Sequence, residues 1–164
     1  MTATLSPQIQ GLSTRVKWVT FSIAQYRFGL AIESVLRVVQ CPPGLKAQFN
    51  PVELIQVEQH TLTLINLKPV LQSTALNPAR SEFLIVTNPE AMDSGRDSEL
   101  YGLRVDTPPD VIEFDPAAIR QLPIAYREQH PLKIASQVAV LPQENATLAI
   151  FLLKMNCLLN HLHQ

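Results

Sequence analysis

Hydrophobic and polar residues alternate along the first half of the chain in a pattern typical of β-strands. The alternation puts Val19, Phe21 and Ile23 on one face and Trp18 on the other. A tight connection follows, and residues 27–32 return as a second strand. The pattern predicts a β-hairpin with an aliphatic face turned toward a core.

A short phrase in the second strand occurs again later in the chain. Residues 28–33 read Phe-Gly-Leu-Ala-Ile-Glu, residues 101–106 read Tyr-Gly-Leu-Arg-Val-Asp, and an alternating strand precedes each copy. This repeat predicts two small β-units built on one plan. Gly29 lies inside its strand, where glycine is typical of a bulge or a barrel corner. The equivalent acids Glu33 and Asp106 are interpreted as residues of a shared turn at a strand end.

The segments that follow the two copies differ in their pattern. Apolar residues after the first copy lie at i, i+3, i+4 and i+7, which predicts a short helix from Ile32 to Val39 that closes one end of a barrel. Pro108 and Pro109 exclude a helix after the second copy. We therefore expect the two units to diverge at this point.

The remaining apolar runs complete an all-β chain. They predict strands over residues 52–57, 61–67, 82–87, 100–106, 111–114, 136–141 and 147–153, one turn of helix after the N-cap Asp115, and a C-terminal helix over 156–162. Loops are expected over residues 45–51, 72–81, 88–98 and 123–133. We expect two compact barrels, with a single sandwich as the alternative.

The domain organisation follows from these elements. We expect a flexible N-terminal arm over residues 1–15 and one domain over residues 16–160. Within it, the first barrel unit covers about 16–71 and the second about 82–160; the sequence leaves open whether they exchange strands.

Composition narrows the classes of function. Apolar residues make up 46% of the chain, charged residues 16%, and the net charge is −1. The small charged fraction fits either apolar surface kept for partners or a well-filled core. Without a basic stripe or a long apolar run, we expect neither nucleic-acid binding nor membrane insertion. Two cysteines in no metal spacing and no export signal favour the cytoplasm.

Catalytic and metal-binding patterns are absent from the sequence. There is no phosphate-binding loop and no nucleophile elbow. His60 is interpreted as a surface residue, and His161 with His163 is a weak metal-ligand pattern at a chain end. We therefore predict no enzymatic activity, no cofactor, no metal and no catalytic residue.

The ordered set of phrases resembles the CheW-like domain of bacterial chemotaxis and phototaxis signalling, over about residues 16–160. The matching phrases are Val-Thr-Phe-Ser-Ile at 19–23, Phe-Gly-Leu-Ala-Ile-Glu-Ser-Val at 28–35, Glu-Leu-Ile-Gln-Val-Glu-Gln at 53–59, Leu-Thr-Leu-Ile-Asn-Leu-Lys at 62–68, Tyr-Gly-Leu-Arg-Val-Asp at 101–106, Val-Ile-Glu-Phe-Asp-Pro at 111–116, and the closing segment 148–159.

The resemblance implies two SH3-like five-stranded barrels and a non-enzymatic adaptor. Such an adaptor links the cytoplasmic tip of a methyl-accepting receptor to the regulatory domain of a CheA-type histidine kinase, in chemotaxis, phototaxis or pilus-motility signalling. It would work in the cytoplasm, at membrane receptor clusters. The oligomeric state, the stimulus and the cognate partners stay open.

The chain departs from the family pattern in its central hairpin. The family carries an arginine there that is implicated in receptor contact, and this chain has Glu58 in its place. A reversed charge at an interface changes the choice of partner. The candidate contacts in a groove between the barrels are Val38, Val39, Leu54 and Glu58. For the two valines, a place in the core is the favoured interpretation. A degenerate paralogue that binds without coupling is one alternative, and a small-ligand-binding barrel is another.

Overall fold

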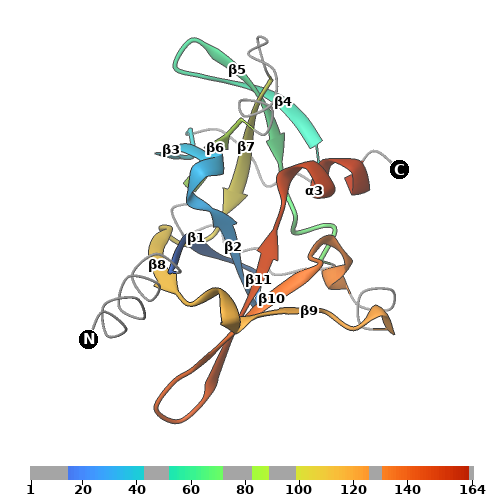
Figure 1. Cartoon of the computed structure of the whole chain (residues 1–164). Helices are drawn as coiled ribbons and strands as arrows, with labels where there is room; N and C mark the ends of the chain where they lie inside the picture. The colour runs from blue at the N-terminus through green and yellow to red at the C-terminus, as the bar shows by residue number, and fades with distance from the viewer. Residues whose placement is uncertain (1–14, 43–51, 72–82, 89–98, 126–130, 163–164) are drawn as a thin grey trace, which may run out of the picture.

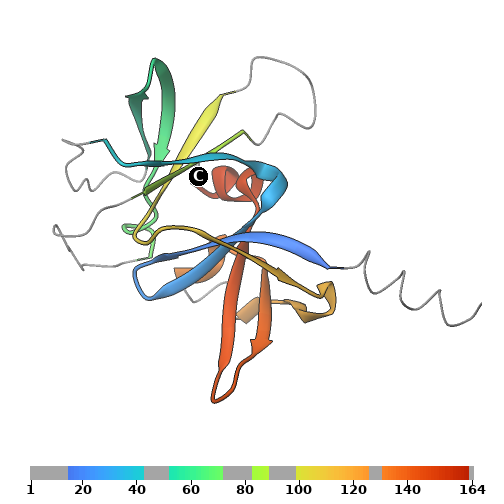
Figure 2. The same ribbon diagram turned by 90° about the vertical axis from the view of Figure 1, so that its left-hand side faces the viewer.

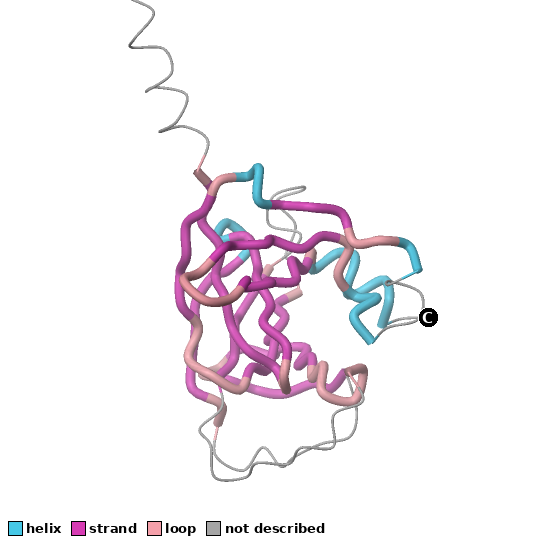
Figure 3. The backbone as a smooth tube through the Cα atoms, turned by 90° about the horizontal axis from the view of Figure 1, so that it is seen from below, coloured by secondary structure: helices cyan, strands magenta, loops and turns pink. Residues whose placement is uncertain are grey.

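The computed structural model describes residues 15–42, 52–71, 83–88, 99–125 and 131–162 (Figure 1). The regular structure in these ranges is almost entirely β-strand, as Figure 3 shows. The strands are β1 (Val16–Ile23), β2 (Tyr26–Ala31), β3 (Val35–Gln40), β4 (Val52–Val57), β5 (His60–Ile65), β6 (Phe83–Thr87), β7 (Leu100–Val105), β8 (Asp110–Phe114), β9 (Ile119–Gln121), β10 (Gln137–Pro142) and β11 (Thr147–Leu153). The all-β prediction is confirmed.

In the part of the chain that the structure describes, helical structure is limited to short segments. The α-helix α3 covers Met155–Leu162, as predicted, and single 3-10 turns cover Ile32–Ser34, Pro116–Ala118 and Pro131–Ile134. The Asp115 side chain accepts a hydrogen bond of 2.9 Å from the Ala117 N–H, which confirms its role as an N-cap. Four predicted segments lie outside the described residues: the arm apart from Arg15, the loop 45–51, the seam 72–81 and the loop 88–98 apart from Asn88.

Two mixed sheets make up the fold, and each draws strands from both halves of the chain. Sheet A has the order β8-β1-β2-β11-β10-β9, and sheet B has the order β3-β6-β7-β5-β4. In Figures 1 and 2, sheet B forms the upper part of the molecule and sheet A the lower part. β2 pairs in parallel with β11, and β7 pairs in parallel with β5. Each repeat consists of three strands, β1 to β3 in the first and β6 to β8 in the second. The third strand of each leaves its own sheet and pairs with the first strand of the other repeat, β3 with β6 and β8 with β1.

One hydrophobic core joins the two sheets. This central core contains the predicted inward face of β1, with Phe21 and Ile23 fully buried. Leu103 of sheet B and Leu158 of α3 are buried in the same cluster. Figure 2 accordingly shows α3 at the level where the sheets meet. The two halves therefore stabilise each other through a shared core.

Each sheet also covers a smaller apolar interior of its own. The sheet A interior includes Trp18, which stacks on Phe114 with ring centroids 6.2 Å apart. The sheet B interior is built around Leu62, Leu84 and Val86. Trp18 and Phe21 thus lie on opposite faces of β1, as the alternation predicts.

The helix predicted from Ile32 to Val39 is wrong. The structure has one 3-10 turn there, followed by the strand β3, so Val38 and Val39 lie on a strand. Pairing with β6 decides the outcome, and the β-branched valines suit a strand better than a helix. Each repeat continues into a third strand, β3 or β8, and a 3-10 turn precedes this strand only in the first repeat.

Two further details differ from the sequence-based expectation. β2 pairs through Gly29 without a register shift, so no bulge occurs at this glycine. Gly29 instead allows close packing, because an added Cβ would lie 3.2 Å from Cγ2 of Ile150 and 3.3 Å from Cδ2 of Leu152. The short strand β9 was not predicted, and it extends sheet A to six strands.

Candidate partner-binding surface

Three of the four predicted contact residues lie on the surface of sheet B. Leu54 on β4 is 71% exposed and Val38 on β3 is 42% exposed. Glu58 lies in the turn between β4 and β5, with its side chain 62% exposed. Val39 is half-buried and packs against the sheet B interior. The role of the four residues in partner binding stays a prediction. Val39 anchors β3 by packing against the sheet B interior.

Val38 is the exposed end of a row of core residues that crosses sheet B. It pairs with Ile85 of β6, and Ile85 pairs with Leu103 of β7. Both of these neighbours are 0% exposed. The apolar face of the central core therefore continues to the edge strand β3, where its last member meets solvent.

Sheet A ends in an equivalent residue. Val111 of the edge strand β8 pairs with Val19, which pairs with Leu30 in the repeated phrase. Leu30 corresponds to Leu103 in the second copy of that phrase. Val111 thus occupies the same place as Val38, and it is 57% exposed. Sequence reasoning missed Val111, because its equivalence to Val38 depends on strands exchanged between the two halves.

Glu58 has a partner that the sequence did not reveal. Nη1 of Arg37 on β3 donates to Oε2 of Glu58 over 2.8 Å, and the two side chains are 41% and 62% exposed. The ion pair joins an edge strand of sheet B to the turn of the β4–β5 hairpin. Glu58 and Gln59 have φ values of 50° and 76°, as a tight two-residue hairpin turn requires.

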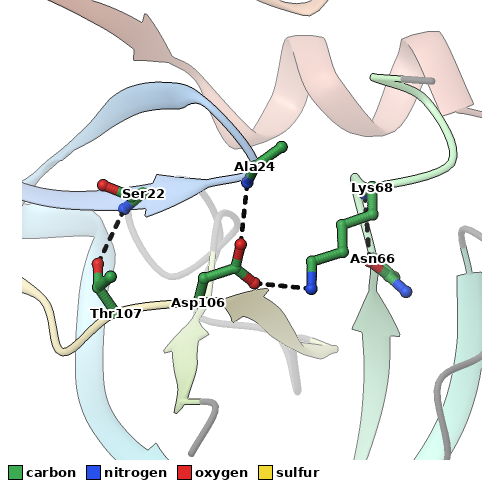
Figure 4. Close-up of polar contacts among 6 residues, drawn as sticks. All are labelled: Ser22, Ala24, Asn66, Lys68, Asp106 and Thr107. Atoms are coloured by element: carbon green, nitrogen blue, oxygen red, sulfur yellow. Dashed lines mark hydrogen bonds and ion pairs between the residues drawn. The ribbon is translucent and has the colours of Figure 1, made fainter. Parts of the chain in front are cut away.

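A second polar cluster links the two sheets and is shown in Figure 4. Asp106, just after β7 of sheet B, accepts a hydrogen bond of 2.9 Å from the N–H of Ala24 in the β1–β2 turn. Its other carboxylate oxygen lies 2.9 Å from Nζ of Lys68, with both side chains 19% exposed. Asn66 accepts a hydrogen bond of 3.2 Å from the Lys68 N–H.

The neighbouring residues extend this junction along the backbone. The Asp106 N–H donates to the Ser22 carbonyl over 2.9 Å, and the Ser22 N–H donates to Oγ1 of Thr107 over 3.2 Å. The carboxylate of Asp106 therefore fixes the β1–β2 turn of sheet A against two segments at the end of sheet B. Glu33, its equivalent in the repeat, is exposed on a 3-10 turn. The expectation that the two acids belong to a shared kind of turn is therefore wrong.

Two other findings concern metal binding and membrane spans. No group of three or more histidine, cysteine, aspartate or glutamate residues in the described ranges is arranged to hold a metal ion. No helix within those same ranges is long and apolar enough to cross a membrane. His163, part of the weak metal-ligand pattern, lies outside them.

Comparison with known proteins identifies the family from the sequence and a similar fold among solved structures. The family model described as the CheW-like domain matches residues 17–162. The crystal structure of the scaffolding protein TtCheW from Thermoanaerobacter tengcongensis is similar, with a TM-score of 0.59 and 20% sequence identity. The alignment covers 83% of this chain and 88% of that one. No curated protein sequence matches significantly.

Proposed function

Because the chain belongs to the family of CheW-like domains, we propose that it is a non-enzymatic adaptor in chemotaxis-type signalling. In this proposal it couples the cytoplasmic tip of a chemoreceptor-type sensor to the regulatory domain of a CheA-type histidine kinase. Its site of action would be the cytoplasmic face of receptor clusters.

One observation supports this proposal most strongly. The two sheets end in equivalent edge strands, β3 and β8, and each presents an exposed valine at the same place in its row. An adaptor needs two separate surfaces, and apolar residues at exposed strand edges are suited to pack against another protein. The edges differ in charge, since β3 carries Arg37 whereas β8 carries Asp110 and Glu113. Such a difference allows each edge to select a different partner.

We assign the β3 edge and the β4–β5 turn to the receptor, and the β8 edge to the kinase. The receptor's helical hairpin would pack on Val38 and Leu54 beside Glu58. The kinase regulatory domain would pack on Val111.

Binding measurements with single variants test this assignment. The partners are the receptor tip and the kinase regulatory domain encoded in the same genome, each captured by the tagged adaptor. Val38→Asp should weaken receptor capture about tenfold and leave kinase capture unchanged, because a buried charge would replace an apolar contact. Val111→Asp should show the reverse pattern, so each variant is the control for the other. If the wild-type chain captures neither partner, the adaptor function is wrong.

A second candidate is a CheW-like protein that binds one partner without coupling it to the other. Glu58 favours it, because the family's receptor-contact position holds the opposite charge in this chain. Kinase activity in a reconstituted mixture of receptor and kinase separates the two functions. A coupling adaptor changes the phosphorylation rate when it is added, whereas a binder of one partner does so only by competing with a functional adaptor.

A further inference from the structure

The ion pair between Arg37 and Glu58 changes the net charge that the hairpin turn presents to a partner. The sequence alone suggests an isolated reversed charge at position 58. In the structure the guanidinium of Arg37 lies 2.8 Å from the Glu58 carboxylate, so the two charges compensate each other. The pair therefore presents no net charge to a partner, but its two charges have a fixed order. The cation lies on the edge strand and the anion lies in the turn.

This pair contributes little to the stability of the fold. Its side chains are 41% and 62% exposed, and exposed ion pairs add little to stability because water and salt screen both charges. Charges that matter little for folding can be exchanged without loss of the fold. Water that surrounds the pair now would be displaced by a bound partner, which strengthens the interaction of each charge with that partner.

Apolar surface adjoins the pair on the same strand. Leu36 is 54% exposed and Val38 is 42% exposed. Val38 pairs with Ile85 of the central core and Arg37 pairs with Val86 of the sheet B interior, so these two side chains leave opposite faces of the edge strand. The pairing of β3 with β6 shifts in register between Val35 and Arg37, so the strand is irregular next to the pair. An apolar contact combined with a directed charge pair provides both affinity and orientation for a partner.

We propose that Arg37 and Glu58 form one specificity element that selects the receptor-type partner by the polarity of the pair. This inference rests on the proposed adaptor function and deepens it. The matching surface is a helical segment with an apolar residue that packs on the exposed edge of β3, an acid that faces Arg37 and a base that faces Glu58. A receptor with the opposite arrangement of charges is rejected, because each of its charges meets a like charge.

A charge-exchange experiment tests the polarity. The variants are Arg37→Glu, Glu58→Arg and the double variant R37E/E58R, which restores an ion pair with its direction reversed. A matched control is R120E/E144R, because Arg120 and Glu144 are exposed residues of sheet A and Glu144 lies in the equivalent hairpin turn. Calorimetric titration measures binding to the receptor tip and to the kinase regulatory domain from the same genome. Circular dichroism confirms that each variant is folded.

We expect the double variant to bind the receptor tip at least tenfold more weakly than the wild type, with kinase binding unchanged. The control should bind both partners as the wild type does. Should the reversed pair not fold, the neutral variant R37Q/E58Q provides the same test, with weaker receptor binding that depends less on salt.

The other outcomes are decisive as well. The double variant could bind at the wild-type level while both single variants are defective. That result would mean that the pair only stabilises this surface within the chain, and it would overturn the polarity proposal. Wild-type binding by all the variants, or a loss of kinase binding instead, would also overturn it. If the wild-type chain binds neither partner, the adaptor function itself fails, and that result is distinct from all of these.

Discussion

At the scale of single residues, the two glycines of the repeated phrase have different surroundings. A Cβ at Gly29 would lie 3.2 Å from Ile150 and 3.3 Å from Leu152, side chains that are themselves buried. At Gly102 the nearest atom would be 3.5 Å away, an ordinary contact with Leu62. The same phrase therefore tolerates different changes in its two copies.

Alanine substitutions should separate the two glycines. We expect Gly29→Ala to lower the free energy of unfolding by about 1–2 kcal/mol, because a tightly packed interior resists added volume. Gly102→Ala should be neutral or slightly stabilising, because alanine restricts the unfolded chain. Urea unfolding of both variants measures the difference. Equal destabilisation at the two positions would show that space around Gly29 is not the limiting factor.

Asp106 makes polar contacts that join the two sheets. We expect Asp106→Ala to cost about 2 kcal/mol, because the Ala24 N–H loses its acceptor and Lys68 loses its counter-charge. Asp106→Asn should cost about half of that, because the amide oxygen can still accept the hydrogen bond. Chemical denaturation gives the order of the variants. Glu33→Ala is the control at the equivalent, exposed position, with an expected change within about 0.5 kcal/mol.

At the scale of elements, the sequence was sufficient to predict strands that pair with their neighbours in the chain. β1 with β2 and β4 with β5 are hairpins of adjacent strands, and their alternation was sufficient to predict them. β3 was mistaken for a helix because Ile32, Val35 and Val39 also match helical spacing. Only its pairing with β6, which is distant in the sequence, determines the answer.

The candidate surface was predictable to the same degree. Glu58 and Leu54 were found from the hairpin pattern and the family resemblance, and both are exposed. Arg37 was missed as the partner of Glu58, because Arg37 lies on β3, Glu58 lies in the β4–β5 turn and no local spacing relates them. β9 was missed because its three residues are too few to show a period.

The two neighbouring valines of β3 provide a test of its strand conformation. Val39→Ala should lower the free energy of unfolding by about 1 kcal/mol, because its side chain packs against the sheet B interior. Val38→Ala should change it by less than about 0.5 kcal/mol, because that side chain faces solvent. Thermal unfolding of both variants measures this contrast. Similar losses at both positions would contradict the alternation that β3 shows.

At the scale of the whole molecule, the shared central core determines how the protein unfolds. Both sheets contribute buried side chains to it, and the Asp106 junction joins their ends. Neither sheet can open without exposing core residues of the other. The two sheets are therefore expected to behave as one cooperative unit.

Two probes placed in different sheets can test this cooperativity. Trp18, the single tryptophan, reports on sheet A through its fluorescence. Amide hydrogen exchange in β6 and β7 reports on sheet B. We expect both to give the same midpoint in urea. Two separate midpoints would mean that the sheets unfold independently.

The exchange of strands also determines when the protein can fold during its synthesis. A ribosome makes β1 and β2 well before β8 and β11, which pair with them in sheet A. Sheet A therefore cannot be completed until β11 has been made, and the early strands need protection from aggregation meanwhile. Cutting the gene between β5 and β6 should give two fragments that purify together only when co-expressed. A soluble, folded fragment obtained alone would contradict this dependence of each half on the other.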